Sequence, residues 1–488
     1  MDIICLFLLF FMSMVWFSKC MDSLNLKAKS KLDMTQGPIM KLIVLFAIPM
    51  VVGNILQQLY STVDTLVIGN YCGPVSIAAV GTSAQPLEVF MCIFMGIGAG
   101  VSILVSMYTG ARDFGALDRV IKTAISFTYM AAIPLSILGI LLTPAILRFM
   151  QVPADTWDYA VTYIRIVFLA LLGNMGYNMN AGILRGLGDS TASLVFLVVS
   201  CVTNVFLDLL FVAGLGMDVS GAALATAISM YLSWAASILY IRKKYAALEF
   251  TILPRLVSRD SLREILRLGL PLGFNNSIYT IGHIMLQSLI NTQGSGFMAG
   301  ASITGKILGV SSIAISSFST SMSTFAGQNY GAKNYVRLRQ GGRIVPLYSA
   351  LITICLGLVM FALSGPMIGL FTDDAEAAKY ALLCIRIQLP FQWCFCVLNT
   401  ILNLANGIGA VKYSTIVNML MLWAVRIPSA FLISRFIDGH YVTGGVSISF
   451  VFGMTAALFF YRSGHWKEML HLAEKQEAAA KALHATAS

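Results

Sequence analysis

Apolar stretches of about twenty residues recur along the whole 488-residue chain, and this feature constrains its fold most strongly. A helix of that length crosses the roughly 30 Å hydrocarbon core of a bilayer. Only helices or closed barrels satisfy their backbone polar groups there, and uninterrupted runs of this length favour helices. The sequence therefore predicts an all-α polytopic membrane protein. Its 11% charged residues agree with that, since soluble domains carry about 25%.

Twelve membrane-spanning helices are predicted from these stretches. They cover residues 40–68, 80–107, 121–142, 160–182, 191–213, 221–241, 269–292, 299–325, 344–364, 380–404, 413–434 and 443–461. The expected organisation is a cytoplasmic flank at 21–39, an N-lobe of helices 1–6 at 40–241, a cytoplasmic linker at 242–268, a C-lobe of helices 7–12 at 269–461 and a cytoplasmic tail at 462–488. Residues 1–20 are a signal peptide, an extra apolar helix or a misassigned start. The stretch lacks the basic n-region of a signal peptide, and a start at Met21 is favoured because a conventional polar flank, MDSLNLKAKSKLDMTQGP, begins there.

The distribution of Lys and Arg predicts the orientation in the membrane. With the N-terminal flank inside, the inner segments hold 24 of the 32 basic residues, and the outer loops hold three, namely Arg148, Lys379 and Arg435. The protein is therefore expected in the cell inner (plasma) membrane, with both ends of the twelve-helix body on the cytoplasmic side. The net charge of +10 then reflects topology, and no nucleic-acid partner is expected.

The chain also contains an internal repeat. YAVTYIRI at 159–166 returns as YALLCIRI at 380–387, and the same offset of 221 relates Gly110-Ala111-Arg112 to Gly331-Ala332-Lys333. Because each copy holds an even number of helices, the two six-helix lobes should be parallel and related by a pseudo-two-fold axis along the membrane normal. Two such lobes suit alternating access, which favours a transporter over a receptor, channel or enzyme.

The two copies differ in a set of polar residues near the outer side of the first lobe. With the offset of 221, Asp64 aligns with Met285, Asn204 with Val425 and Asp208 with Ser429 of the second copy. Asn204 and Asp208 are four residues apart and share one helix face.

Thr226 is expected at similar depth, and Asn174, Asn178 or Asn180 of helix 4 could add an amide. Two carboxylates in a low-dielectric pocket tend to share a proton, and with amide and hydroxyl oxygens they also suit sodium. The alternative is that both aspartates are solvated residues of a water-filled cleft.

These residues carry a family resemblance. IPMVVGNILQQLYSTVDTLVIGN, ILRGLGDSTAS, NVFLDLLF, VSGAALATAIS, GQNYGAKNY and WAVRIP, in this order, resemble the multidrug and toxic compound extrusion (MATE) family over roughly residues 35–462. The resemblance implies an antiporter that exports organic, often cationic, drugs. Helices 7 and 10 lack the acids of one family branch, so the chain is more similar to the DNA-damage-inducible branch.

Carried over from that branch, Asp64, Asn204, Asp208 and Thr226 match the proton or sodium site. The helix 4 amide is either Asn174, by depth, or Asn180, by distance before the RGLGD loop. Gln57 and Tyr60 match substrate-contacting positions, and Met285 joins them as the second-lobe counterpart of Asp64.

The expected ligands are small organic cations and a coupling ion, H⁺ or Na⁺, with no cofactor. The protein is expected to be a monomer in the lipid bilayer and not an enzyme. A lipid-linked oligosaccharide flippase of related fold is the first alternative, and a non-transporting receptor or scaffold is the second.

Several charged residues are left over. Glu88 either edges the cleft or faces headgroups, and Lys306 is a candidate partner for it. Arg165, Arg386 and Arg426 are interpreted as snorkelling to the headgroups, and His283 as a packed histidine.

Overall fold

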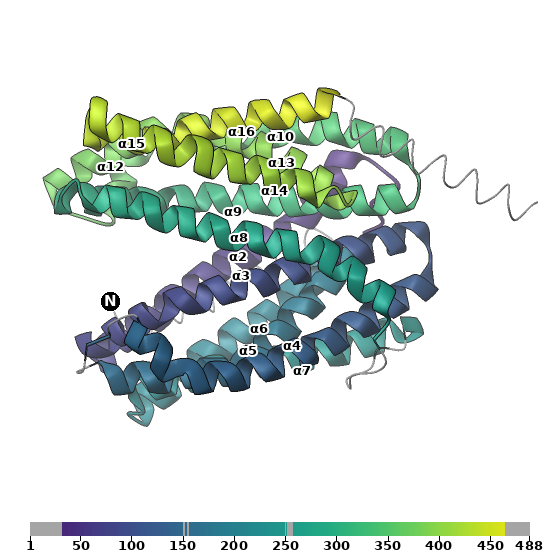
Figure 1. Cartoon of the computed structure of the whole chain (residues 1–488), viewed down its shortest axis with the longest axis horizontal. Coiled ribbons are helices and arrows are strands. Elements are labelled where there is room, and N and C mark those ends of the chain that lie inside the picture. Colours follow the sequence, from purple (N-terminus) through teal and green to yellow (C-terminus); the bar gives the residue numbers. More distant parts are fainter. Residues whose placement is uncertain (1–31, 150–151, 154–155, 249, 251–256, 464–488) are drawn as a thin grey trace, which may run out of the picture.

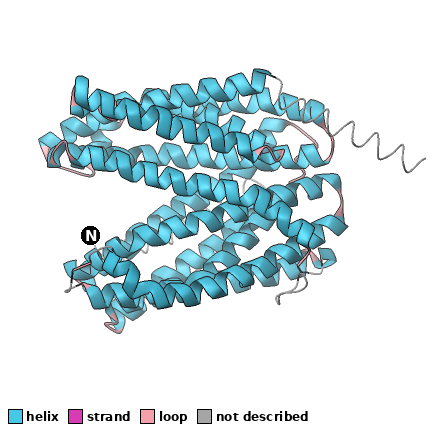
Figure 2. Ribbon diagram, in the orientation of Figure 1, coloured by secondary structure: helices cyan, strands magenta, loops and turns pink. Residues whose placement is uncertain are grey.

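The computed structural model describes residues 32–149, 152–153, 156–248, 250 and 257–463. The described chain is helical throughout, with short loops between the helices (Figure 2). The helices of the first half are α2 (Ile39–Tyr71), α3 (Pro74–Ala111), α4 (Phe114–Phe149), α5 (Trp157–Gly186), α6 (Ser190–Asp208) with the π-helical η2 (Leu209–Gly214), and α7 (Asp218–Lys244). Those of the second half are α8 (Arg259–Asn291), α9 (Ser295–Gly331), α10 (Tyr335–Ala362), α12 (Ala375–Gln388) continued by α13 (Gln392–Gly407), α14 (Val411–Met419) with η5 (Leu420–Arg426) and α15 (Ile427–Phe436), and α16 (Gly444–Ser463).

Eleven of these helical segments are long and apolar enough to cross a membrane. The twelfth predicted span corresponds to α8, which carries Asn275, Asn276, His283 and Gln287 and is therefore the least apolar. It runs alongside the others over 33 residues (Figure 1). All twelve predicted spans thus correspond to helices, and most helices extend a turn or two beyond the predicted ends.

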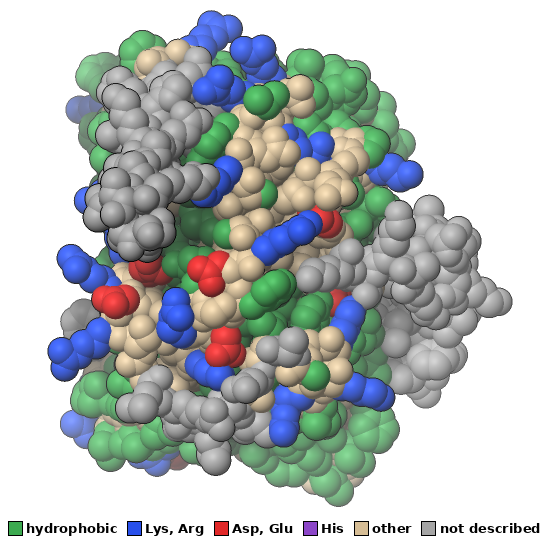
Figure 3. All heavy atoms as spheres, turned by 90° about the vertical axis from the view of Figure 1, so that its right-hand side faces the viewer, with side chains coloured by type: hydrophobic (Ala, Val, Ile, Leu, Met, Phe, Trp, Pro, Cys, Tyr) green, Lys and Arg blue, Asp and Glu red, His purple; other side chains and the backbone are tan. Residues whose placement is uncertain are grey.

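The helices form two lobes, α2–α7 and α8–α16, that diverge at one end of the molecule and meet at the other (Figure 1). We call the end where the lobes meet the basic end, because α2 begins and α16 ends there and Lys and Arg side chains gather around it (Figure 3). The opposite end is called the open end. The parallel arrangement of the two lobes confirms the prediction from the internal repeat.

The two lobes touch backbone to backbone where α3 crosses α9 at the basic end. A Cβ on Gly110 would lie 1.9 Å from the carbonyl oxygen of Gln328, and one on Gly331 would lie 1.8 Å from the carbonyl oxygen of Met107. The repeat offset of 221 relates Met107 to Gln328 and Gly110 to Gly331. The two contacts are therefore copies of each other, and the pseudo-two-fold axis passes between them.

Glycines also let α3 pack against α8 on the same side of the molecule. A Cβ on Gly96 would lie 2.1 Å from the backbone nitrogen of Gly273, and one on Gly100 would lie 2.7 Å from Cα of Gly269. The backbones therefore touch, as small residues allow between membrane helices.

The segment before α2 joins both lobes at the basic end. The Leu32 N–H donates to the Gly188 carbonyl of the N-lobe at 3.0 Å. The Met34 N–H donates to Oε1 of Gln328 in α9 at 2.9 Å, and Asn329 and Arg337 donate to the Met34 carbonyl at 3.0 and 3.1 Å. Met34 is fully buried, so this part of the predicted flank is packed between the lobes.

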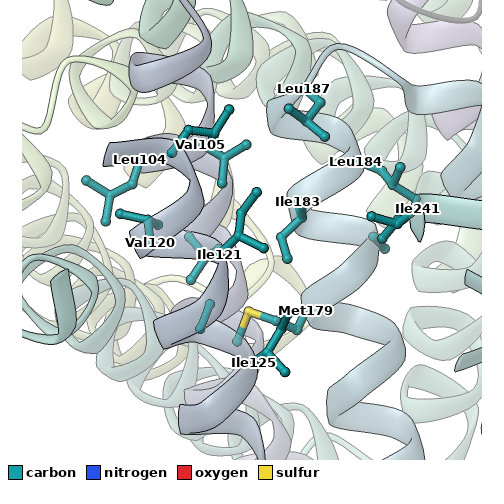
Figure 4. Packing of buried hydrophobic residues seen from close by; sticks show 14 of the residues in the cluster. Leu104, Val105, Val120, Ile121, Ile125, Met179, Ile183, Leu184, Leu187 and Ile241 are labelled. Atoms are coloured by element: carbon teal, nitrogen blue, oxygen red, sulfur yellow. The ribbon is translucent and has the colours of Figure 1, made fainter. Parts of the chain in front are cut away.

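The core of the N-lobe lies near the basic end, where α3, α4, α5 and α7 meet. Figure 4 shows their side chains interlocking there, with Val105 and Ile121 on one side and Ile183 and Ile241 on the other. This packing fixes the helices whose distal parts carry the polar residues of the candidate site.

The start of α8 differs from its sequence interpretation. The segment SRDSLREILRLGLP is amphipathic, a pattern that also suits a stretch lying on the membrane surface, but in the structure it continues into the apolar span, and Arg259–Asn291 is one continuous helix. The Ser258 hydroxyl caps it by accepting from the Ser261 N–H at 3.4 Å, and Arg259, Arg263 and Arg267 are exposed along its first turns. The tail after Ser463 and residues 1–20 lie outside the described residues.

Candidate cation site in the N-lobe

Two carboxyl groups meet in the outer half of the N-lobe. Asp64 lies in the last two turns of α2, and Asp208 is the last residue of α6 before the π-helical segment η2. Their side chains are close enough to interact directly. Asp208 is fully buried and Asp64 is partly buried. π-Helical segments occur often at functional sites, and here η2 begins at the residue after Asp208.

An amide and a hydroxyl complete this group. Asn204 lies one turn before Asp208 and is buried, and its side chain contacts Thr226 of α7 at 3.3 Å. With the amide oriented so that its oxygen accepts from Thr226 N and Oγ1, its nitrogen donates to Oδ2 of Asp208 at 3.2 Å. This orientation satisfies both ends of the amide. The structure thus brings together Asp64, Asn204, Asp208 and Thr226.

Each carboxyl group of the site has an oxygen that could still accept a hydrogen bond or bind a cation. Oδ1 of Asp64 and Oδ1 of Asp208 are buried and have no hydrogen-bond partner among the described residues. A buried acceptor without a partner is costly, by about 1–3 kcal/mol or more if charged. A proton shared by the two carboxyls would relieve this, and so would a hard cation held by carboxylate, amide and hydroxyl oxygens. The donor set therefore fits either H⁺ or Na⁺.

The two candidate amides of helix 4 are placed differently. Nδ2 of Asn174 lies 4.0 Å from Sδ of Met230, which is one turn from Thr226. Met230 also accepts a hydrogen bond from Ser200, which lies one turn before Asn204. Asn174 is therefore linked to the site through Met230 and does not contact it directly. Asn180 instead donates to Ser237 at 2.8 Å, about three turns of α7 from Thr226. In this structure Asn180 therefore lies apart from Asp64, Asn204, Asp208 and Thr226, and Asn174 lies nearer to them.

A tyrosine that the sequence interpretation missed lies beside the carboxyls. Tyr163 of α5 is close enough to Asp64, Asp208 and Tyr60 to interact with them electrostatically. The internal repeat could have revealed it, because Tyr163 falls on Cys384 in the second copy. Tyr60 lies one turn before Asp64 and packs between two apolar clusters, so it borders the site as expected.

The inner faces of the diverging helices are polar and exposed. On α2 these residues are Gln57, Gln58, Ser61, Thr62 and Thr65, and on α8 they are Asn276, His283, Gln287 and Ser288. Polar side chains at bilayer depth face water or protein in preference to lipid. The two faces therefore suit a water-filled space between the lobes, bordered by Gln57 on α2 and by Gln287 on α8.

Met285 is 44% exposed and lines a hollow of about 230 Å³ between α8 and α15. Ser429, the counterpart of Asp208, donates to the carbonyls of Val425 and Arg426 within its own helix. The second lobe therefore has no equivalent of the carboxyl pair at these positions.

Arg426 corrects the interpretation that it snorkels to the headgroups. Its side chain is 1% exposed and lies inside the C-lobe. Nε donates to Ser449 at 3.0 Å, Nη1 donates to Tyr279 at 3.2 Å, and the guanidinium lies 5.3 Å from the rings of Tyr279 and Phe450. Nη2 has no hydrogen-bond partner among the described residues. Arg165 and Arg386 are exposed, as snorkelling requires.

The remaining charged residues lie apart from the carboxyl pair. Lys306 is exposed and its ammonium lies 5.7 Å from the ring of Phe371 near the open end. Glu88 belongs to α3, but its side chain is outside the described part of the structure. His283 is exposed on α8, with its ring 5.9 Å from that of Tyr279, so it is not the packed histidine that was expected.

Comparison with known proteins agrees with this architecture. The MatE family model matches residues 49–210 and 271–432, once in each lobe. The chain is 27% identical over 444 residues to probable multidrug resistance protein YpnP of Bacillus subtilis (strain 168), covering 91% of this chain and 99% of the relative. It is 23% identical over 433 residues to DNA damage-inducible protein F of Escherichia coli (strain K12), and the match covers 86% of this chain and 91% of that relative.

Solved structures share the fold. An outward-facing multidrug resistance MATE family transporter of the MOP superfamily superposes with a TM-score of 0.82 at 24% identity, covering 91% of this chain and 98% of that one. A MATE in the bent conformation superposes with the same TM-score at 22% identity. The chain belongs to the multidrug and toxic compound extrusion (MATE) family of membrane transporters.

Proposed function

We propose that this chain is a cation-coupled antiporter that exports organic, often cationic, compounds by alternating access. The observation that carries the proposal is the pair of carboxyl groups, Asp64 and Asp208, which lie side by side in one lobe, each with a buried oxygen that has no hydrogen-bond partner in the described part of the chain. A buried pair of this kind is unstable as two free carboxylates. It would therefore change its affinity for H⁺ or Na⁺ when the surroundings change.

The proposed cycle uses the two ends of the molecule. The basic end faces the cytoplasm, since Lys and Arg accumulate on that side of membrane proteins. In the conformation described, the lobes diverge at the open end and are closed at the basic end by the α3–α9 crossing and the Leu32–Met34 segment. A coupling ion enters from outside, neutralises Asp64 and Asp208, and an organic cation leaves.

The lobes then close at the open end and separate at the basic end, where the ion is released and a new substrate binds. Antiport requires that ion and substrate favour different states of the protein. A positively charged substrate would be held by the same carboxylates that the ion neutralises, so binding of the ion weakens binding of the substrate. On this proposal Gln57, Tyr60 and Met285 contact the substrate.

Purified protein in liposomes can test the proposal. We expect a fluorescent organic cation such as ethidium to be moved by a pH gradient without sodium, or by a sodium gradient at equal pH. Transport driven by the pH gradient alone would identify H⁺ as the coupling ion, and transport driven by sodium alone would identify Na⁺.

Asp208→Asn should abolish transport against a gradient in either case, because it removes one of the two ionisable groups while keeping the side-chain size. Asp373→Asn removes an exposed acid outside the site and should leave transport unchanged. Normal transport by Asp208→Asn at matched expression would show that this carboxyl does not couple the ion. Movement of a lipid-linked oligosaccharide, and no movement of dye, would favour a flippase.

A further inference from the structure

A groove runs along the outside of the C-lobe near the basic end. It has a volume of about 740 Å³ and lies between α10, α13 and α16, which pack together in the upper lobe of Figure 1. That volume is within the roughly 300–1,000 Å³ range of small-molecule sites. The groove is formed within one lobe, so it is separate from the space between the lobes.

The two ends of the groove differ in character. Arg339 and Arg343 of α10 and Arg462 of α16 line it at the basic end. Deeper in the membrane the walls are apolar, formed by residues such as Leu347, Trp393 and Met454. From Arg343 to Ala350, and from Arg462 back to Met454, the helices rise roughly 10–12 Å. A polar head and a short length of hydrocarbon therefore fit along the groove.

Within the described part of the chain, no acidic side chain pairs with the three arginines of this groove. The helices α10, α13 and α16 contain no Asp or Glu in their sequences. Among the described residues, no ion pair involves Arg339, Arg343 or Arg462. Nε of Arg339 is buried and has no hydrogen-bond partner there either. Three cations at one end of an apolar groove attract an anion that carries its own apolar part.

The N-lobe offers an internal comparison, because the repeat places a second copy of these helices there. The offset of 221 relates Ala350 to Tyr129. In the N-lobe, Tyr129 and Trp234 pack with ring centroids 5.7 Å apart, and Asn180 donates to Ser237 at 2.8 Å. The corresponding space has a volume of only about 10 Å³.

The charges differ between the lobes in the same way. Arg339 and Arg343 fall on Asp118 and Lys122, which form an ion pair at 2.6 Å. As far as the described residues go, the N-lobe copy is thus filled and neutralised, whereas the C-lobe copy is open and basic. The difference shows that neither the cavity nor its charge is required by the fold itself.

We propose that this groove binds one anionic phospholipid from the leaflet at the basic end, with its phosphate on Arg339, Arg343 and Arg462 and an acyl chain along the apolar walls. Basic pockets between membrane helices bind anionic headgroups. The surface beside the groove faces the bilayer, since Leu347 and Phe459 are 59% and 76% exposed. A lipid can therefore enter sideways, and its chain would replace water in the apolar part.

Native mass spectrometry of the detergent-purified full chain, with phosphatidylglycerol or phosphatidylcholine added, tests this proposal. The wild type should retain one phosphatidylglycerol in preference to phosphatidylcholine. The triple variant Arg339→Gln, Arg343→Gln, Arg462→Gln should bind phosphatidylglycerol on the order of a hundredfold more weakly, at about 1 kcal/mol for each basic side chain.

The matched control removes three other arginines at the same end, with the variants Arg259→Gln, Arg263→Gln and Arg267→Gln in α8. These side chains are exposed and spaced one turn apart, so the control changes the net charge equally and should keep the lipid. A second variant, Ala350→Tyr, places the N-lobe residue in the groove and should reduce retention without changing the charge.

Equal loss of lipid in both triple variants would overturn the proposal, since a general electrostatic attraction would then explain binding. Equal retention of phosphatidylcholine and phosphatidylglycerol by the wild type would overturn it as well. The readout is lipid binding and not transport, so a failure here is distinguishable from a failure of the antiport proposal.

Discussion

The α3–α9 crossing can be tested by adding one methyl group to it. In Gly331→Ala, the new Cβ would lie 1.8 Å from the Met107 carbonyl oxygen, and such contacts essentially never occur below 3.0 Å. Because backbone atoms form both sides of the contact, the two helices must move apart by about 1 Å to admit the methyl group. Overpacking of this kind costs roughly 1–3 kcal/mol of free energy. The matched control is Gly305→Ala in the same helix, where nothing lies within 4 Å of the added Cβ.

Both variants replace a glycine of α9 by alanine, which by itself favours the helix, by up to about 1 kcal/mol in a helix interior and less at the helix end where Gly331 lies. A destabilisation confined to Gly331→Ala therefore reports the contact. The strain acts only while the basic end is closed. It should therefore shift the population toward conformations open at that end, by roughly 5- to 150-fold for 1–3 kcal/mol. Hydrogen exchange measured by mass spectrometry reports such opening through the backbone amides.

We expect faster exchange at residues 105–112 and 326–333 in Gly331→Ala, and wild-type exchange there in Gly305→Ala. Gly110→Ala should behave like Gly331→Ala, because it is the symmetry-related contact. If Gly331→Ala exchanged like the wild type, the two backbones would not be in contact at this point. The reasoning about the closed end would then be wrong.

Three further predictions concern the two lobes. Tyr163→Phe should change the ion dependence of transport while the protein remains folded, because its hydroxyl lies near the carboxyl pair; an unchanged ion dependence would remove it from the site. Arg426→Lys should lower stability by about 1–3 kcal/mol, since lysine loses the planar fork on two hydroxyls and its ring stacking, and thermal unfolding in detergent measures this; an unchanged midpoint would contradict it. Met285→Ala and Ser429→Ala should alter the range or rate of substrates in dye-efflux assays while keeping ion dependence, and loss of that dependence would show that coupling is not confined to the N-lobe.

The sequence was informative about the helices because each span is set by one physical requirement, a length of apolar chain that matches the bilayer. The least apolar span, α8, was still found, since its polar residues are separated by apolar ones. Its first turns were misjudged because charged residues before an apolar span look the same whether they lie along the membrane surface or continue the helix. Only tertiary packing decides between these two outcomes.

The candidate site was predictable where the repeat breaks, and less so elsewhere. Asp64, Asn204, Asp208 and Thr226 meet because three helices bring them to one depth, and depth can be counted along a sequence. The choice between Asn174 and Asn180 depends on helix rotation, which counting does not give. Arg426 was misjudged for the same reason: its depth suits snorkelling, but its helix face points into the lobe, where Tyr279 and Ser449 accept its hydrogen bonds.

The symmetric contact between α3 and α9 has a consequence for how the two halves could diverge. Met107 meets Gly331 and Gly110 meets Gln328, which is the isologous pattern of a homodimer interface joined within a single chain. A residue beside such an axis packs against the other half, so a change there must be accommodated by both halves, whereas a change away from the axis affects one half alone. An aspartate pair could therefore arise in one half and a buried arginine in the other, because neither lies where the halves must still match.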